Sequence, residues 1–187
     1  MNEYYDNRLE TGEFAEGFGE YDENRMAKRL KLSFKLMSIR YRAEITDENE
    51  DVVYTVASDL FMTSGGATYI YDAQGLKQAH ITEVGPTIGK RYLVNMNNGA
   101  VFEVVGDDYG FHVTHFDWTI DGRAAGSEFT IRDAKSKAVA LINVKAFSLH
   151  IRHDIIVLDQ EKEDVIAAIA VVLARSGIEI RRNESVD

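Results

Sequence analysis

The chain has 187 residues, of which 45% are apolar and none is cysteine, and its formal net charge is −10. This length and composition are typical of one globular domain and argue against a largely disordered chain, a disulfide scaffold or a thiolate zinc site. The acidic balance argues against a nucleic-acid-binding protein, which usually needs a basic face. The N-terminus lacks the pattern of a signal peptide, so a cytoplasmic location is expected.

The first 29 residues differ from the rest of the chain and are expected to form a weakly ordered acidic extension. Residues 1–24 hold eight acidic residues against one arginine, which leaves a charge of −7 in this stretch and −3 in everything after it. Phe14, Phe18 and Tyr21 follow helical spacing, although Gly17 and Gly19 disfavour a helix. The extension therefore suits either an aromatic motif that docks on a protein partner or a solvated tail.

From residue 30 onward the sequence alternates between apolar and polar residues, which is typical of half-buried β-strands. The first run, LKLSFKL at residues 30–36, places leucine or phenylalanine at every second position. Further β-rich runs occupy residues 39–45, 52–58, 67–72, 78–84, 91–96, 100–105, 111–120, 128–133, 138–146 and 148–158. About a dozen short strands separated by turns predict a sandwich or a barrel.

The turns between these runs form a repeat. Asp47, Asp72 and Asn97 follow one another at intervals of 25 residues, each between two strands. Asp133 and Asp159 occupy similar places later in the chain. Because Asp, Asn and Gly supply the geometry of tight turns, each unit is expected to be a β-hairpin. A long series of hairpins must close or stack to protect its edge strands.

The segment from Val165 to Ala174 contains ten apolar residues in succession. A transmembrane helix needs about 20 such residues, so this run is too short to cross a bilayer. Its alanines favour a helix over a strand, the acids before it suit a helix N-terminus, and Gly177 suits a C-cap. These features predict a helix over about 164–175. Because that helix has no polar face, it must be surrounded. The sequence therefore predicts a mainly β (α+β) fold, an antiparallel barrel of about twelve strands around a central apolar C-terminal helix.

The order of these units resembles the LURP-one-related family of the tubby C-terminal-like superfamily. The resemblance covers roughly residues 30–175. Its main segments are the turn at 69–75, FDWTIDG at 116–122, FTIRDAKSKAVALI at 129–142 and HDIIVLDQEKEDVIAAIAVVLA at 153–174. The resemblance implies a twelve-stranded barrel filled by the terminal helix. The expected organisation is an extension at 1–29, the tubby-like barrel with its helix at 30–177 and a tail at 178–187.

Four basic residues are the candidate ligand-binding residues. Arg40 and Arg42 fall on the same face of one expected strand, and Lys90 and Arg91 lie on the corresponding strand of the third hairpin unit, so these residues are predicted to gather at one rim of the barrel. Guanidinium groups suit phosphate. Similarity to tubby domains and phospholipid scramblases implies a phosphoinositide or another phospholipid headgroup as the ligand. The alternative is that all four are ordinary outward-facing cations of strands.

The sequence offers no motif for a catalytic centre, a cofactor or a metal. His112 with His115, and His150 with His153, are expected on strands, where residues three apart face opposite sides and disfavour a shared metal. A serine nucleophile elbow and a phosphate-binding glycine loop are absent from the sequence. The sequence therefore predicts a non-enzymatic binding or scaffold domain of the LURP-one-related type, without identifying its ligand.

Overall fold

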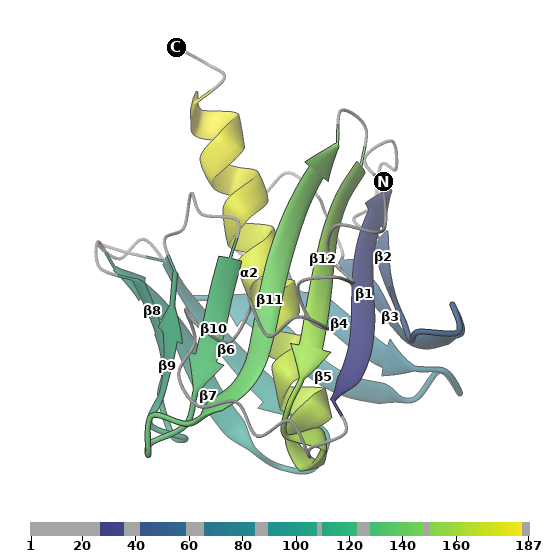
Figure 1. The fold of residues 1–187 in the computed structure, drawn as a ribbon. Helices are drawn as coiled ribbons and strands as arrows, with labels where there is room; N and C mark the ends of the chain where they lie inside the picture. The colour runs from purple at the N-terminus through teal and green to yellow at the C-terminus, as the bar shows by residue number, and fades with distance from the viewer. Residues whose placement is uncertain are drawn as a thin grey trace, which may run out of the picture.

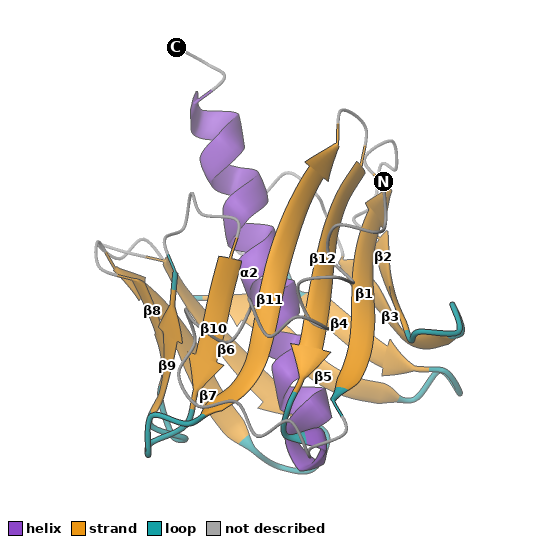
Figure 2. Ribbon diagram, in the orientation of Figure 1, coloured by secondary structure: helices purple, strands orange, loops and turns teal. Residues whose placement is uncertain are grey.

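The computed structural model describes residues 27–35, 42–58, 66–84, 90–107, 110–122, 128–147 and 150–184. These residues form twelve antiparallel strands and one long helix (Figures 1 and 2). The strands are β1 (Lys28–Lys35), β2 (Arg42–Thr46), β3 (Val52–Ser58), β4 (Thr68–Asp72), β5 (Lys77–Glu83), β6 (Lys90–Met96), β7 (Val101–Asp107), β8 (Gly110–Val113), β9 (Trp118–Asp121), β10 (Glu128–Arg132), β11 (Ala138–Phe147) and β12 (His150–Val157). A short 3-10 helix, η1 (Gln160–Lys162), leads into the helix α2 (Glu163–Glu184).

The strands close into a barrel in which each strand pairs with its neighbours in the sequence and β1 pairs with β12. The closing pair aligns Lys28 with Val157 and Lys35 with His150. Closure leaves the series of hairpins without an edge strand, which removes the usual site of edge-to-edge aggregation. The predicted antiparallel barrel of about twelve strands is confirmed.

The two ends of the barrel differ. One end, called the base below, carries the turns that follow β2, β4, β6, β8 and β10, and α2 begins there after β12. The other end, called the mouth below, carries the links that follow the odd-numbered strands. Figure 1 shows α2 running through the barrel from base to mouth and its last turns passing beyond the strands.

The core consists of inward-facing strand residues packed around α2. On β6, for example, Tyr92, Val94 and Met96 are buried while the residues between them are only partly covered. Every residue from Val165 to Ala174 on α2 is at most 3% exposed. Alanine and valine keep the helix thin, so that wall side chains can approach it from all sides. The predicted central helix is confirmed.

The helix is longer than the sequence pattern predicted. It continues to Glu184, past Gly177, which was expected to cap it near residue 175. A glycine inside a helix costs only about 1 kcal/mol, and the following segment, IEIRRNE, contains good helix formers. Residues 178–184, expected in a tail, therefore continue the helix.

One expected strand is divided in two. The run at residues 111–120 forms β8 and β9, joined by a turn over residues 114–117. His115 and Asp117 adopt positive φ values of 73° and 53° in this turn. Because the turn contains neither glycine nor proline, the usual turn signal is missing from the sequence.

Three of the hairpin turns share one hydrogen-bond pattern. Oδ1 of Asp47, Asp72 and Asp133 accepts hydrogen bonds from the backbone N–H groups two and four residues later, at 2.8–3.0 Å. The residue three positions after each aspartate has a positive φ: Glu50 (66°), Gly75 (78°) and Ser136 (62°). Each aspartate side chain thus holds its own turn closed, as proposed from the repeat.

The turn between β6 and β7 follows the same backbone course without an aspartate. Met96 N–H donates to Ala100 O at 2.8 Å, as Asp72 N–H donates to Leu76 O at 2.9 Å. Met96 therefore takes the place of the aspartate, one residue before the predicted Asn97. Asn98 Oδ1 instead accepts from Ala100 N–H at 3.0 Å.

Candidate functional site

The strand order separates the basic residues predicted to bind phosphate. Arg40 lies outside the described residues, and Arg42 begins β2, although its side chain is not described. Lys90 and Arg91 begin β6. Both strands start at the mouth, but β3, β4 and β5 lie between them. At about 4.8 Å per strand, β2 and β6 are about 19 Å apart along the wall, too far for one phosphate group to bridge.

Lys90 and Arg91 are adjacent in the sequence, so their side chains face opposite sides of the barrel wall. Lys90 shares the inward face with Tyr92, whereas Arg91 faces outward. Nε and Nη2 of Arg91 donate to Oε2 of Glu103 on β7, at 2.9 and 2.6 Å. This carboxylate neutralises the guanidinium, so Arg91 is already engaged in an ion pair at the outer surface.

A polar cluster at the mouth involves Arg175, which the sequence analysis did not single out. Its Nη1 donates to Gly66 O at 2.8 Å and to Thr68 Oγ1 at 2.9 Å, and its Nη2 lies 3.8 Å from Glu83 Oε2. Its guanidinium also lies 5.9 Å from the centre of the Tyr92 ring. An arginine that follows ten buried residues on a helix is still close to the barrel wall and needs acceptors there. These contacts hold α2 in the mouth.

A second polar cluster anchors α2 at the base. Lys28 Nζ lies 2.8 Å from Glu163 Oε2, and Tyr54 O–H donates to Glu163 Oε1 at 3.3 Å. Burial, followed by the negative charge of Glu163, raises the pKa of the Tyr54 phenol far above its ordinary value. The cluster joins the start of α2 to β1 and β3, so its role is structural.

The histidine pairs do not form a metal site among the described residues. His112 lies exposed on β8, but His115 lies in the following turn rather than on a strand as expected. His153 is buried against the edge of Phe34, with ring centres 5.7 Å apart, and the side chain of His150 is not described. Within the described ranges, no group of three or more His, Cys, Asp or Glu residues could hold a metal ion.

The outer face of β10 and β11 is buried as deeply as the core. Thr130, Leu141 and Asn143 face away from α2, yet they are only 3%, 7% and 8% exposed. Elsewhere on the wall, outward residues such as Thr55 and Leu93 are exposed or half-buried. Among the described elements, none packs across this face, since α2 contacts the strands from inside.

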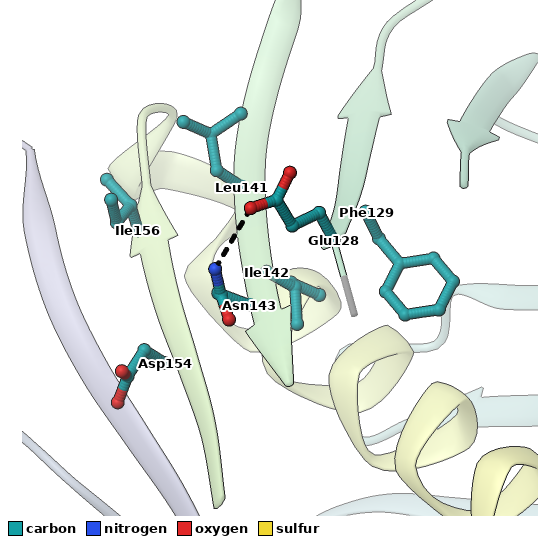
Figure 3. A pocket seen from close by; sticks show the side chains of 7 residues that line it. All are labelled: Glu128, Phe129, Leu141, Ile142, Asn143, Asp154 and Ile156. Carbon is teal, nitrogen blue, oxygen red and sulfur yellow. Dashed lines mark hydrogen bonds between the residues drawn. The ribbon is translucent and has the colours of Figure 1, made fainter. Parts of the chain in front are cut away.

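A shallow groove lies on this face, across β10, β11 and β12 (Figure 3). Its lining consists of Glu128, Phe129, Leu141, Ile142, Asn143, Asp154 and Ile156. Leu141 and Ile156 supply apolar sides, and Asn143 Nδ2 donates to Glu128 Oε1 at 3.4 Å. The groove has room for about one water molecule, about 20 Å³. Pockets for small molecules usually enclose about 300–1,000 Å³, so this groove is too small for such a ligand.

The comparisons with known proteins agree with this architecture. Residues 28–174 match the family model described as LURP-one-related. The chain belongs to the LURP-one-related family. The resemblance expected from the sequence is thereby confirmed. No curated protein sequence matches the chain.

The LURP-one-related barrel also has a counterpart among solved structures. The X-ray structure of a protein from Arabidopsis thaliana matches with a TM-score of 0.57 and 15% sequence identity. The match covers 78% of this chain and 90% of the plant protein. At this identity the likeness concerns the fold alone. Within the described residues of the LURP-one-related chain, no helix has the length and apolar character needed to cross a membrane.

Proposed function

We propose that this LURP-one-related protein is a non-enzymatic, cytoplasmic binding domain that recognises an extended polypeptide segment on the outer face of β10, β11 and β12. The observation that carries the proposal is the groove beside Leu141 and Ile156, on a face across which no described element packs. Outward side chains of an antiparallel sheet face solvent unless something packs on them. This face has the properties of a contact surface.

The chemistry of the groove favours a polypeptide over a small molecule. The groove is too small for a small-molecule ligand, whereas Leu141 and Ile156 offer apolar surface against which a side chain of a bound segment can lie. The exposed carboxylate of Glu128 lies at one side. Its Oε1 accepts from Asn143, and its remaining lone pairs can accept from backbone N–H donors of a bound segment. Inside the barrel, side chains of α2 such as Ile169 are fully buried.

Selection of a random peptide library on the full chain tests the proposal. Peptides that bind are expected to carry an aromatic or aliphatic anchor, and their affinity is measured by fluorescence anisotropy. Ile156→Asp should weaken binding by about tenfold or more, because it places a charge in the groove. Leu93→Asp is the matched control, since Leu93 faces outward on β6, diametrically opposite β12 in the strand order. Equal effects of the two substitutions, or no effect of either, contradict the proposal.

Recognition of phosphoinositide or other phospholipid headgroups by Arg40, Arg42, Lys90 and Arg91 stays a separate prediction. The separation of β2 from β6 and the pairing of Arg91 with Glu103 give it less support. Sedimentation with liposomes, with and without a phosphoinositide, is the test. Headgroup-dependent binding that is lost on Arg40→Ala with Arg42→Ala would favour this second function.

A further inference from the structure

We infer that a second contact surface, on the outer side of β3, β4 and β5, binds a positively charged segment of a protein partner that also carries aliphatic side chains. The surface, called the β3–β5 surface below, consists of Val52, Tyr69, Tyr71, Leu76 and His80. In the strand order, β4 lies diametrically opposite β10. The inference therefore goes beyond the proposed function and does not depend on the groove across β10, β11 and β12.

Strand pairing brings three aromatic rings of this surface together. Tyr69 and Tyr71 alternate with the buried Ile70, so both face outward from β4. Tyr69 is aligned with His80 of β5, and the two rings are stacked with their centres 5.0 Å apart. The centre of the Tyr71 ring lies 6.4 Å from that of Tyr69. The three rings therefore form a continuous row on the outer wall.

Two exposed aliphatic side chains continue this surface toward the base. Tyr54 is aligned with Asp72. Val52, two residues nearer the base, therefore lies beside the turn that contains Leu76. Val52 is 40% exposed and Leu76 is 62% exposed, and among the described residues Val101 is the one other large apolar side chain classed with them. Single exposed apolar residues are ordinary, but apolar side chains gathered beside a row of rings are typical of a contact surface.

The turn next to Val52 is strongly acidic. Residues 47–51 include four acids and no base, which gives this turn a charge of −4. Three of these acids are exposed, namely Glu48, Glu50 and Asp51. Two lysines offset part of the charge: Lys31, which lies 3.5 Å from Glu50, and the exposed Lys77. These residues together retain a charge of −2 beside the apolar side chains.

The charges and the rings of the β3–β5 surface favour the same kind of partner. Carboxylates attract cations, and the faces of tyrosine rings also attract the cationic groups of arginine and lysine. Val52 and Leu76 offer apolar area that an aliphatic side chain of the partner can cover. The excess of acids disfavours nucleic acid and anionic membranes. The occupant that fits is a polypeptide segment in which arginine or lysine accompanies leucine or a similar residue.

Three synthetic peptides of roughly 12 residues, long enough to cross the three strands, test the inference on the full chain. The first combines arginine with leucine, the second has glutamate in place of arginine, and the third has serine in place of leucine. Fluorescence anisotropy should show that the arginine–leucine peptide binds at least about tenfold more tightly than either of the others. Equal binding of the glutamate peptide or of the arginine–serine peptide overturns the inference.

Substitutions locate the site on the barrel. Leu76→Ser and Tyr71→Ser should each weaken binding of the arginine–leucine peptide by about fivefold or more, and Glu50→Asn by about threefold. Asp117→Asn is the matched control for Glu50→Asn and should leave the affinity unchanged. Both residues are exposed carboxylates with a positive φ in a base turn, and asparagine tolerates this conformation. Asp117 follows β8, four strands away from β4.

The control also separates this surface from a general attraction to the acidic chain. The extension expected at the N-terminus, of which residues 1–26 lie outside the described residues, carries negative charge as well. If the peptide responded only to net charge, Glu50→Asn and Asp117→Asn would weaken binding equally. That result, or unchanged affinity in both Leu76→Ser and Tyr71→Ser, overturns the inference.

A second readout needs no substitution and also distinguishes the two contact surfaces. Adding the arginine–leucine peptide to the wild-type protein should shift the amide resonances of Val52, Tyr71 and Leu76 and leave those of Thr130 and Leu141 in place. Shifts confined to Thr130 and Leu141 would place the peptide on the groove of the proposed function and overturn this inference. Shifts of both sets alike, or of neither, overturn it as well.

Discussion

Arg175, on α2, donates a hydrogen bond at 2.8 Å to the carbonyl oxygen of Gly66, a residue 109 positions earlier in the sequence. With Thr68 and Glu83, this contact ties the helix to β4 and β5 at the mouth. The buried part of the helix is thereby fixed at both ends, because Lys28 and Tyr54 hold Glu163 at the base.

Replacing Arg175 should therefore destabilise the fold even though the residue lies outside the apolar run. Arg175→Met keeps much of the side-chain volume but leaves the half-buried carbonyl of Gly66, the buried hydroxyl of Thr68 and the Glu83 carboxylate without this donor. We expect a loss of about 2–3 kcal/mol in the free energy of unfolding, measured by urea denaturation. Adding Glu83→Gln should recover part of this loss. A loss well below about 1 kcal/mol would show that the mouth contacts contribute little.

The pH dependence of the free energy of unfolding should show the effect of ionising the Tyr54 phenol. Its pKa is raised in the folded state, first by burial and then by Glu163, whereas in the unfolded chain it ionises near its ordinary value of about 10. The neutral phenol of Tyr54 therefore contributes fully to the stability of the fold below about pH 10. This contribution is lost as the pH rises from there toward the folded-state pKa. Unfolding by urea at a series of pH values should show a steeper loss of stability for the wild type than for Tyr54→Phe above about pH 10. Parallel curves for the two proteins would contradict this expectation.

Substitutions in equivalent turns should have opposite effects. Gly75 and Ser136 both have positive φ, at 78° and 62°, and a Cβ atom at Gly75 would meet no neighbour within 4 Å. Gly75→Ala should cost about 1 kcal/mol through backbone strain alone. Ser136→Gly relieves the same strain and should raise stability slightly, by less than about 1 kcal/mol. The unfolding temperatures of the two variants, compared with that of the wild type, measure the sign of each change in stability. Changes of the same sign would refute the shared turn geometry.

The packing around α2 should tolerate neither loss nor gain of volume. Ile169 and Ala168 are both fully buried. Ile169→Ala should cost about 2–5 kcal/mol by leaving a cavity, and Ala168→Leu about 1–3 kcal/mol by forcing the wall apart. Denaturant unfolding of the two variants tests this. If Ala168→Leu were neutral, the wall would not be in close contact with that side of the helix.

Most of the fold could be predicted because its signals are local. Alternation along residues 30–36 and the apolar run from Val165 to Ala174 each reflect a single physical requirement, burial on one face or on all faces. The aspartate turns are also local, since Asp72 bonds to backbone groups within four residues. Such signals survive without knowledge of the tertiary structure. They yielded the barrel, its central helix and the family.

The features that were not predicted depend on contacts between distant residues or on missing local signals. The helix α2 ends at Glu184 and not near residue 175 as predicted, because Gly177 is tolerated where the helix leaves the barrel. The turn between β8 and β9 has neither glycine nor proline to mark it. The contact of Arg175 with Glu83 depends on the tertiary structure, because the two residues are far apart in the sequence and meet only in the closed barrel. The groove beside Leu141 could not be anticipated either, because alternation marks Leu141 as outward without indicating which side chains of β10 and β12 lie around it.

The position of α2 in the chain has a consequence for biosynthesis. The wall strands leave the ribosome first, and their inward side chains, such as Ile81 and Val94, have no partner until residues 165–174 follow. The pairing of β1 with β12 likewise waits for a strand made more than a hundred residues after its partner. Nascent chains halted before α2 would expose the apolar inner face of the strands to solvent. Such chains would depend on chaperones or be degraded. Folding of this barrel is therefore expected to finish only after α2 has been synthesised.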